Sequence, residues 1–575
     1  GFLGLERIRE LTVAKEGPGL DFDTALELSR AGTVFTTHTP VPAGIDRFPR
    51  ELISQYFGGG SSPVPGVPAD RVLALGAEDY AGGDPAVFNM AVMGFRLAQR
   101  ANGVSELHGH VSRGMFNGLW PAFDEAEVPI GSITNGVHGP SWVAREVFEL
   151  AAKHGVVPDT EDVSDYWSLV EAIPAKELWD LKHTLREHLV KDARSRLAKS
   201  TAKRGYAAAE LAWTETALDP DVLTIGFARR VPSYKRLTLM LRDPERLRKL
   251  LLHPERPIQL IIAGKSHPAD DGGKKLIQEM VKFADDPDVR HRIVFLPNYD
   301  IAMAQPLYPG CDVWLNNPLR PYEACGTSGM KAALNGGLNL SILDGWWAEG
   351  HDGANGWAIG GARLYGPEDQ PLQDELDCAE LFRLLEEDVV PEFYARDAAD
   401  LPQAWLRRVR HSLASIPPRF SAERMVGEYA ERAYLPLARE QRRLSEADFA
   451  AAAEQARRDA RLRDAFGRVA IRGLRIAELD GLHAGDAIPV RATLQLGELA
   501  PEDLVVELLL GRPDGPQRLA EQRRVELQPV GPVLGGECSF EARPVLDQVG
   551  RFAYGLRVRA RDLGSGGLDD LTIWA

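Results

Sequence analysis

Five short apolar segments alternate with helical stretches in the middle of this sequence, and no other feature constrains its fold as strongly. The apolar segments are Val222–Phe227, Ile258–Ala263, Ile293–Leu296, Val313–Leu315 and Leu338–Leu343. Stretches such as Lys275–Phe283 between them have helical spacing. The alternation predicts an α/β domain built on a doubly wound parallel sheet. The loops with Arg229, Tyr299 and Gly326 then follow the carboxyl ends of strands, the edge at which such sheets bind ligands.

Changes of pattern divide the chain into four parts. Residues 1–216 mix helices with short motif loops and are predicted to be the remainder of a first α/β domain. Residues 217–420 hold the parallel sheet, and residues 421–468 are connecting helices, the second opened by the capping pattern Ser445-x-x-Asp448. Residues 469–575 alternate apolar and other side chains, as in the stretch 552–558, which predicts a small β-sandwich.

Composition and charge exclude two classes of partner. The chain of 575 residues has a formal net charge of -16 and no long basic run, so it would repel a nucleic-acid backbone. No apolar run approaches the roughly 20 residues of a membrane-spanning helix. The four cysteines lack C-x-x-C spacing, which favours a reducing, cytoplasmic compartment. His108-Gly109-His110 has no cysteine or carboxylate cluster beside it, which favours a structural role over a metal site.

The strongest functional motif is Glu323-Ala324-Cys325-Gly326-Thr327-Ser328-Gly329-Met330-Lys331. It leads from an apolar segment into a helix-forming stretch that stops at Asn335-Gly336-Gly337. Free N–H groups and the helix dipole favour a phosphate at such a point, and glycines let it come close to the backbone. Lys331, in the first turn, would be a counter-ion or a Schiff-base former. The alternative is an ordinary helix N-terminus capped by Thr327 or Ser328.

Four further motifs occur around this one in a fixed order. They are Thr37–Gly44, Ile133–His138, Phe227–Arg236 and Phe295–Tyr299. Together the five motifs resemble the α-glucan phosphorylases of glycogen, starch and maltodextrin, and most closely the bacterial branch. The resemblance implies a two-domain, GT-B-like glycosyltransferase architecture, a homodimer, and a first domain whose N-terminal portion would precede Gly1. It leaves open whether the β-sandwich holds glucan or only packs against the other domains.

The resemblance also implies the reaction and the cofactor. The reaction is reversible phosphorolysis of α-1,4-glucan by inorganic phosphate to glucose 1-phosphate, with retention of configuration, and the cofactor is pyridoxal 5'-phosphate. Lys331 would form the Schiff base with it. The other implied cofactor-binding residues are Arg229, Gly326, Thr327, Tyr299 and Trp142. Because the cofactor phosphate would meet the substrate phosphate, a cation cluster is needed, and the candidates are Arg229, Arg230, Lys235 and Arg236.

Within that cluster the resemblance assigns Arg230 and Lys235 to the substrate phosphate as catalytic cations. On the sugar side, His38 and Asn135 match residues that bind around the 6-hydroxyl group, and His38 is also a catalytic candidate. Glu323 matches the residue that accepts a hydrogen bond from the 3-hydroxyl group. Without the resemblance, the cation run would be a solvated face and His38 a buried structural histidine. Tyr234 is either a sugar contact or a packing residue.

Two other functions remain open from the sequence. A nucleotide-sugar glycosyltransferase of the same architecture would also need arginine and lysine at the sheet edge, but it has no use for Lys331. A non-catalytic glucan-binding fragment is the other, since a glycine-rich loop and an acidic loop that the family implies would precede Gly1. The departures at Cys325, Ser328-Gly329 and Pro232-Ser233 from common family residues leave the preferred glucan length open.

Overall fold

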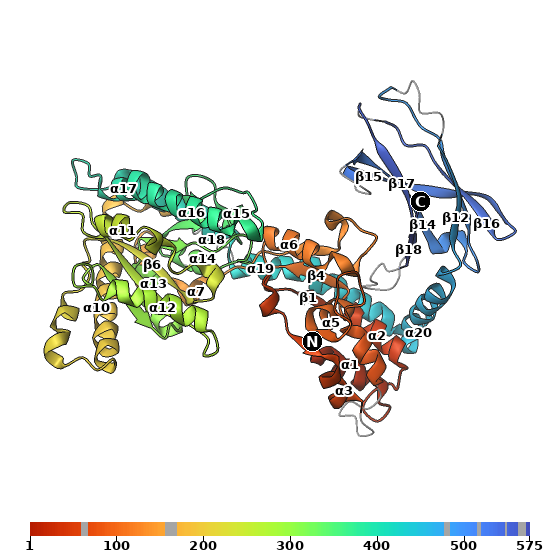
Figure 1. The fold of residues 1–575 in the computed structure, drawn as a ribbon, viewed down its shortest axis with the longest axis horizontal. Helices are drawn as coiled ribbons and strands as arrows, with labels where there is room; N and C mark the ends of the chain where they lie inside the picture. Colours follow the sequence, from red (N-terminus) through yellow and green to blue (C-terminus); the bar gives the residue numbers. More distant parts are fainter. Residues whose placement is uncertain (59–66, 156–168, 477–482, 514–518, 547–548, 562–570) are drawn as a thin grey trace.

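The computed structural model describes all residues except 59–66, 156–168, 477–482, 514–518, 547–548 and 562–570 (Figure 1). Its strands form two small sheets in a first lobe, a parallel sheet in a second lobe and an antiparallel sheet near the C-terminus (Figure 1). The chain is thus a mixed α/β protein with a separate antiparallel sheet, as the sequence predicts. Among the described helices, none is both long and apolar enough to span a bilayer.

The parallel sheet of the second lobe contains the five predicted strands and one more. Its order is β11-β10-β9-β6-β7-β8, and all neighbours are parallel. The chain runs from β6 outward to β7 and β8 and then returns to β9 on the other side of β6. Open α/β sheets bind ligands at such a reversal. The strands are β6 (Leu223–Arg230), β7 (Ile258–Lys265), β8 (Ile293–Pro297), β9 (Val313–Asn316), β10 (Leu338–Ile342) and β11 (Gly356–Ile359).

Helices cover both faces of this sheet because alternate strand residues are buried on opposite sides. In β6, Phe227 belongs to one apolar cluster and Ala228 to the other. Against the face of Phe227 lie α11 (Pro244–Leu251), α12 (Asp271–Ala284), α16 (Gln370–Leu384), α17 (Val390–Tyr394) and α18 (Gln403–Arg419). Against the face of Ala228 lie α10 (Ala175–Lys203) and α13 (Ile301–Gly310). Helix α10 therefore packs on the second lobe, although it precedes the expected domain boundary at residue 216.

The first lobe is built around a three-stranded parallel sheet with the order β1-β4-β5. These strands are β1 (Val34–Thr36), β4 (Arg100–Gly103) and β5 (Ile130–Ser132), and an antiparallel pair joins β2 (Arg47–Pro49) to β3 (Val87–Asn89). The helices around them are α1 (Phe2–Thr12), α2 (Phe22–Ala31), α3 (Arg50–Phe57), α4 (Ala69–Leu75), α5 (Met90–Arg96) and α6 (Glu106–Phe116). The loop after β4 reaches the second lobe, where Oγ of Ser105 donates to the carbonyl of Ala324 at 2.6 Å.

The chain crosses between the lobes twice, and the two crossings lie side by side. The N–H of Val137 donates to the carbonyl of Phe420 at 3.0 Å, and the N–H of Ala422 donates to the carbonyl of Val137 at 2.9 Å. A Cβ atom at Gly136 would lie 2.0 Å from the carbonyl oxygen of Ser421, so only glycine allows this approach. The first crossing leads into α7 (Gly139–Trp142) and α8 (Arg145–Lys153), and the second into α19 (Ala422–Tyr429) and α20 (Leu435–Phe466), which pack on the first lobe (Figure 1).

The predicted helix cap at Ser445 is wrong. Its hydroxyl donates to the carbonyl of Gln441 at 2.7 Å, so it serves the preceding turn instead of accepting from the N–H of Asp448. A serine hydroxyl can bond back in this way to the carbonyl four residues earlier. Residues 446–449 leave helical geometry, so a break between two helices is present, but it follows Ser445 and the helix before it continues from Leu435.

The C-terminal part forms one connected sheet in which every neighbouring pair is antiparallel. The predicted alternation is present, since Val490 and Ala492 are buried while Arg491 between them is exposed. In the order β12-β13-β16-β15-β14-β17-β18, the strands are Ala470–Ile476, Val490–Gln495, Glu537–Ala542, Leu519–Leu534, Leu504–Pro513, Ala553–Ala560 and Thr572–Trp574.

Arg557 of β17 anchors this sheet to the first lobe. Its side chain is fully buried and donates to the carbonyl of Ala122 at 2.8 Å. The guanidinium pairs with Glu127 at 2.8 Å and with Glu507 of its own sheet at 2.9 Å. Glu127 also pairs with Arg524 of β15 at 2.9 Å. One carboxylate of the first lobe thus binds two arginines of the C-terminal sheet.

Replacing Glu127 with glutamine is expected to loosen the C-terminal sheet from the first lobe. Glu507 still compensates part of the charge of Arg557, so we expect a loss of about 1–3 kcal/mol in the free energy of unfolding. Limited proteolysis should cut faster between α20 and β12 in this variant. Glu541→Gln is the matched control, because Glu541 of β16 pairs with Arg491 of β13 on the surface of the same sheet. Equal cleavage of Glu127→Gln and the wild type would contradict the anchoring role.

Candidate functional site

The candidate site lies where the strand order reverses, at the carboxyl ends of β6 and β9. Arg229, near the end of β6, is buried and donates through Nη2 to Oδ1 of Asn316 at the end of β9. Its Nε and Nη1 atoms are buried without a hydrogen-bond acceptor in the described residues. Burial lowers the pKa of Arg229 from its ordinary value. A buried guanidinium with two unused donors is suited to receive an anion.

The carboxylate of Glu323 lies between two of the predicted cations. It forms an ion pair with the ammonium of Lys235 and lies 3.7 Å from Nη1 of Arg229. The side chains of Glu323 and Lys235 are only 9% and 15% exposed, so water screens their attraction poorly. Burial lowers the pKa of the Lys235 ammonium, while the charge of Glu323 raises it. Glu323 therefore neutralises the cations that the sequence assigns to phosphate groups.

The other two predicted cations do not join this cluster. Arg230, the last residue of β6, is exposed. Arg236 is buried and turned into the protein, where Nε donates to the carbonyl of Asn317 at 2.9 Å and the guanidinium pairs with Asp374 at 3.0 Å. The structure thus leaves Arg230 at the rim of the site and gives Arg236 contacts that fix the loop after β6 to α16.

Lys331 is the fourth residue of α14 (Ser328–Ala333), and its amine faces aromatic rings. Nζ lies 3.7 Å from the ring centroid of Trp142 and 5.6 Å from that of Tyr308. Desolvation lowers the pKa of Lys331, and no charged neighbour in the described part of the chain opposes it. A lower pKa increases the fraction of neutral amine, which is the form that condenses with an aldehyde.

Tyr308 joins the predicted aromatic residues Tyr299 and Trp142 into one wall. The hydroxyl groups of Tyr299 and Tyr308 are 2.7 Å apart, and the rings of Trp142 and Tyr308 meet edge to face with centroids 5.6 Å apart. Burial raises the pKa of Tyr308, so its hydroxyl remains protonated. The sequence did not single out Tyr308. Its spacing of nine residues from Tyr299, across α13, was the available signal, but spacing alone does not give the direction of a side chain.

Glycines shape the loop that enters α14. Gly326 has a φ of 80°, which L side chains rarely adopt, and a Cβ atom at Gly329 would lie 2.2 Å from Oδ1 of Asn339. Thr327 occupies the N-cap position without a side-chain hydrogen bond to the helix. Oγ of Ser328 accepts from Nε1 of Trp314 at 3.1 Å. The alternative of an ordinary cap by Thr327 or Ser328 is therefore wrong.

The predicted sugar-side residues come from both lobes. Asn135 follows β5, and its backbone lies near the thiol of Cys325 in the loop before α14, where it partly offsets the rise that burial causes in the pKa of Cys325. Tyr234 is half-buried, and its ring centroid lies 5.0 Å from Nζ of Lys235. His38 follows β1 at the same edge of the small sheet as Asn135, and it is exposed. The structure thus joins Asn135 and Tyr234 to the loop and cations, while His38 stands exposed on the first lobe.

The two histidines of His108-Gly109-His110 have different surroundings. His108 is buried and its Nδ1 accepts from the N–H of Val104 at 3.2 Å, and burial lowers the pKa of His108 to about 4. His110 is exposed and lies 3.5 Å from Glu125. Within the described ranges, no group of three His, Cys, Asp or Glu side chains could hold a metal ion.

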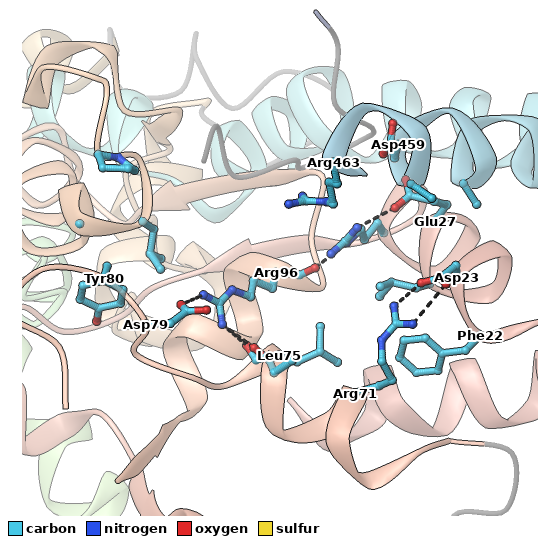
Figure 2. A pocket seen from close by; sticks show the side chains of 18 of the residues that line it. Phe22, Asp23, Glu27, Arg71, Leu75, Asp79, Tyr80, Arg96, Asp459 and Arg463 are labelled. Carbon is cyan, nitrogen blue, oxygen red and sulfur yellow. Dashed lines mark hydrogen bonds and ion pairs between the residues drawn. The ribbon is translucent and has the colours of Figure 1, made fainter. Parts of the chain in front are cut away.

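A cavity of about 670 Å³ lies elsewhere in the first lobe, between α2, α4 and α20 (Figure 2). Arg71 pairs with Asp23 and Arg96 with Asp79 (Figure 2), and Arg30 pairs with Glu27 at 2.6 Å. Arg96 also donates to the carbonyl of Leu75 at 3.4 Å. The cavity contains none of the residues singled out by the sequence motifs, so we do not assign it to the candidate site.

Comparison with known proteins agrees with the motifs. The carbohydrate phosphorylase family matches residues 80–353, and the glycogen phosphorylase C-terminal domain matches residues 467–563. A glycogen phosphorylase of Mycobacterium tuberculosis (strain ATCC 25618 / H37Rv) is 53% identical over 98% of this chain and 64% of its own length. Over these two ranges the chain is similar to the carbohydrate phosphorylases. The predicted resemblance, including that to bacterial members, is thereby confirmed.

Two further relatives have lower identity to this chain. A maltodextrin phosphorylase of Thermococcus litoralis is 38% identical over 86% of the chain and 56% of its own length. A glycogen phosphorylase of Aquifex aeolicus is 41% identical over 74% of the chain and 60% of its own length. The chain thus spans just under two thirds of the length of its most similar relatives named here.

The residues at the reversal point fit a phosphorylated aldehyde such as the cofactor implied by the motifs. Arg229 provides two buried donors without acceptors, and Lys331 provides a desolvated amine. Gly326 gives the backbone a conformation without a Cβ atom in the way of a phosphate. Trp142 and Tyr299 provide flat walls on which an aromatic ring can pack. Charge, hydrogen-bonding capacity and shape therefore agree with the predicted group.

Proposed function

We propose that this chain carries the catalytic centre of a pyridoxal-phosphate-dependent α-glucan phosphorylase. The reaction would be reversible transfer of a glucosyl unit from an α-1,4-glucan, such as glycogen or maltodextrin, to inorganic phosphate, giving glucose 1-phosphate with retention of configuration. The observation that carries the proposal is the desolvated amine of Lys331 at the same sheet edge as the buried, incompletely paired Arg229. The names of the relatives support the substrate class.

The cofactor residues would act by holding and orienting. Lys331 would attach the cofactor through its neutral amine, with Trp142 and Tyr299 against the ring. Arg229, the backbone at Gly326 and Thr327 would hold the phosphate group. When bound, pyridoxal phosphate supplies an aldehyde for attachment and a phosphate that can give and take a proton near neutral pH.

The substrate residues divide between phosphate and sugar. Lys235 and the exposed Arg230 would bind the substrate phosphate, where the arginine fork gives two-point recognition and the lysine a point charge. The residues proposed to bind the sugar are Glu323, Asn135, His38 and Tyr234. Hydrogen bonds to the sugar hydroxyls would orient the ring and strengthen as it flattens toward an oxocarbenium ion.

The proposal extends to architecture and setting. It includes a two-lobed GT-B-like arrangement, with residues 1–216 as part of the first domain, 217–420 as the cofactor domain, 421–468 as connecting helices and 469–575 as a β-sandwich. It also includes a homodimer in the cytoplasm. The parallel sheet with helices on both faces and the two chain crossings support the two-lobed part of the proposal.

Reductive trapping tests the proposal directly. Incubation of the 575-residue chain with pyridoxal phosphate, borohydride reduction and peptide mapping should place the adduct on Lys331. Because desolvation lowers its pKa, Lys331 should react at neutral pH ahead of exposed lysines. Lys331→Arg keeps the charge but cannot condense, so it should lose the adduct. Lys274→Arg, at an exposed lysine that pairs with Asp271, is the matched control and should keep it.

The same experiment separates the competing functions. A wild-type chain without an adduct on Lys331 would remove the phosphorylase proposal and favour a nucleotide-sugar glycosyltransferase. An adduct together with release of glucose 1-phosphate from maltodextrin and phosphate would eliminate the non-catalytic fragment. An adduct without release of glucose 1-phosphate would establish cofactor binding and would favour the non-catalytic glucan-binding fragment.

A further inference from the structure

A buried carboxylate lies directly behind Glu323. Asp344 follows β10 at the carboxyl edge of the parallel sheet and has no exposed surface. Its Oδ2 accepts from the backbone N–H of Glu323 at 3.0 Å, and its Oδ1 accepts from the N–H of Gly345 at 2.8 Å. Each oxygen is thus engaged by a backbone donor, one from the loop before α14 and one from the turn after β10.

Two further contacts hold the same loop. The N–H of Trp346, in the turn that begins at Asp344, donates to the carbonyl of Cys325 at 3.0 Å. From the first lobe, Oγ of Ser105 donates to the carbonyl of Ala324 at 2.6 Å. Because the backbone is fixed at three successive residues, the direction of the Glu323 carboxylate depends only on its side-chain torsions and on its ion pair with Lys235.

We propose that Asp344 is a positioning residue for the reaction: by holding the N–H of Glu323 it aims the Glu323 carboxylate at the glucosyl ring. The inference rests on the proposed function, because Glu323 is the residue assigned to a sugar hydroxyl. Asn316 also holds Arg229, and Pro232 holds the backbone of Lys235, while the Lys235 ammonium pairs with Glu323 itself. Because the Glu323 carboxylate competes with phosphate for these cations, loss of Asp344 should weaken sugar recognition without weakening phosphate recognition.

The chemistry of the position favours this role over a packing role. Burial raises the pKa of Asp344 to about 7, Glu323 adds repulsion, and the two backbone donors and Arg320 act in the opposite direction. Asparagine would fill the same volume without the charge, but it has one acceptor oxygen, and its amide NH₂ would face a backbone N–H. A buried carboxylate with a pKa raised to about 7, beside a candidate site, is typical of a functional position.

Binding measurements on Asp344→Asn test the inference. The full chain, loaded with pyridoxal phosphate, is titrated with glucose 1-phosphate and with inorganic phosphate by calorimetry. We expect the affinity for glucose 1-phosphate to fall about 10–100-fold and that for inorganic phosphate to stay the same or to rise by up to about tenfold. Hydrogen exchange of the Glu323 amide should become faster. Asp270→Asn is the control, because Asp270 also accepts a backbone N–H, that of Gly273 at 2.8 Å, and should change neither affinity.

The outcomes separate the inference from the function beneath it. A wild-type chain that binds inorganic phosphate but not glucose 1-phosphate would overturn the proposed function, and the role of Asp344 with it. If the wild type binds both ligands and Asp344→Asn matches it, Asp344 has no positioning role. If Asp344→Asn loses both ligands alike, Asp344 serves folding, and the inference is equally overturned.

Discussion

Replacing Asp312 with asparagine is expected to lower the free energy of unfolding by roughly 3–5 kcal/mol. Asp312 and Arg186 form an ion pair at 2.6 Å in which each side chain is only 1% exposed. The second oxygen of Asp312 accepts from the N–H of Thr224 at 3.0 Å. The variant would leave the charge of Arg186 buried without a counter-charge, and that cost exceeds the value of the pair itself. Urea unfolding followed by circular dichroism measures the loss.

Loss of this ion pair should also disturb the candidate site, because the pair joins three elements that support the site. Arg186 belongs to α10, Asp312 precedes β9, and Thr224 belongs to β6. Asp180→Asn, on the same helix, is the matched control: Asp180 pairs with Lys176 in water, where such a pair contributes about 0.3–0.5 kcal/mol. If the two variants were equally stable, the buried pair would not be the link between α10 and the sheet.

Replacing Glu323 with glutamine is expected to strengthen phosphate binding and to slow phosphorolysis. Its carboxylate neutralises Lys235 and lies near Arg229, so it competes with any phosphate for these cations. Removing the charge should strengthen binding of inorganic phosphate about tenfold, as calorimetry would show. The same change removes the acceptor proposed for the sugar, so phosphorolysis of maltodextrin should slow about 10²–10³-fold.

Glu375→Gln is the matched control for Glu323→Gln. It makes the same substitution at an exposed residue of α16 and should leave both phosphate affinity and the rate of phosphorolysis unchanged. Lys235→Met should weaken phosphate binding, which identifies the cation for which Glu323 competes. Weaker phosphate binding by Glu323→Gln would contradict the competition and would mean that the carboxylate instead orders the cations for phosphate.

The strands could be predicted because their signal is local. Each apolar run in the second lobe is short, is bounded by polar or turn residues and is buried on both faces, so β6 to β10 appear close to the expected positions. The cap at Ser445 failed because the same hydroxyl can bond in either direction along the helix, and the sequence does not say which. Helix α10 lies in the part of the chain assigned to the first domain but packs on the second lobe, because the residues that it contacts, such as Leu307, lie far along the chain.

The site was predictable to the extent that it follows strand ends. Arg229 and Glu323 come together because both lie at the carboxyl edge of the sheet, as the strand order requires. The inward turn of Arg236, beside Lys235, depends on the distant acceptor Asn317, which no local pattern indicates. Tyr308 was missed for the same reason, since only the packed structure shows that it faces Tyr299.

The close approach at Gly136 has a mechanical consequence. No side chain separates the two passing backbones there, so the lobes share a narrow waist formed by Val137 and Ser421. The backbone bonds of Val137 to the second crossing hold the two segments in register, so a rotation of one lobe against the other that keeps these bonds would turn about this line. Such a rotation would alter the gap between Asn135 and the loop at Cys325. A methyl group at position 136 would lie 2.0 Å from the carbonyl oxygen of Ser421 and would push the two crossings apart.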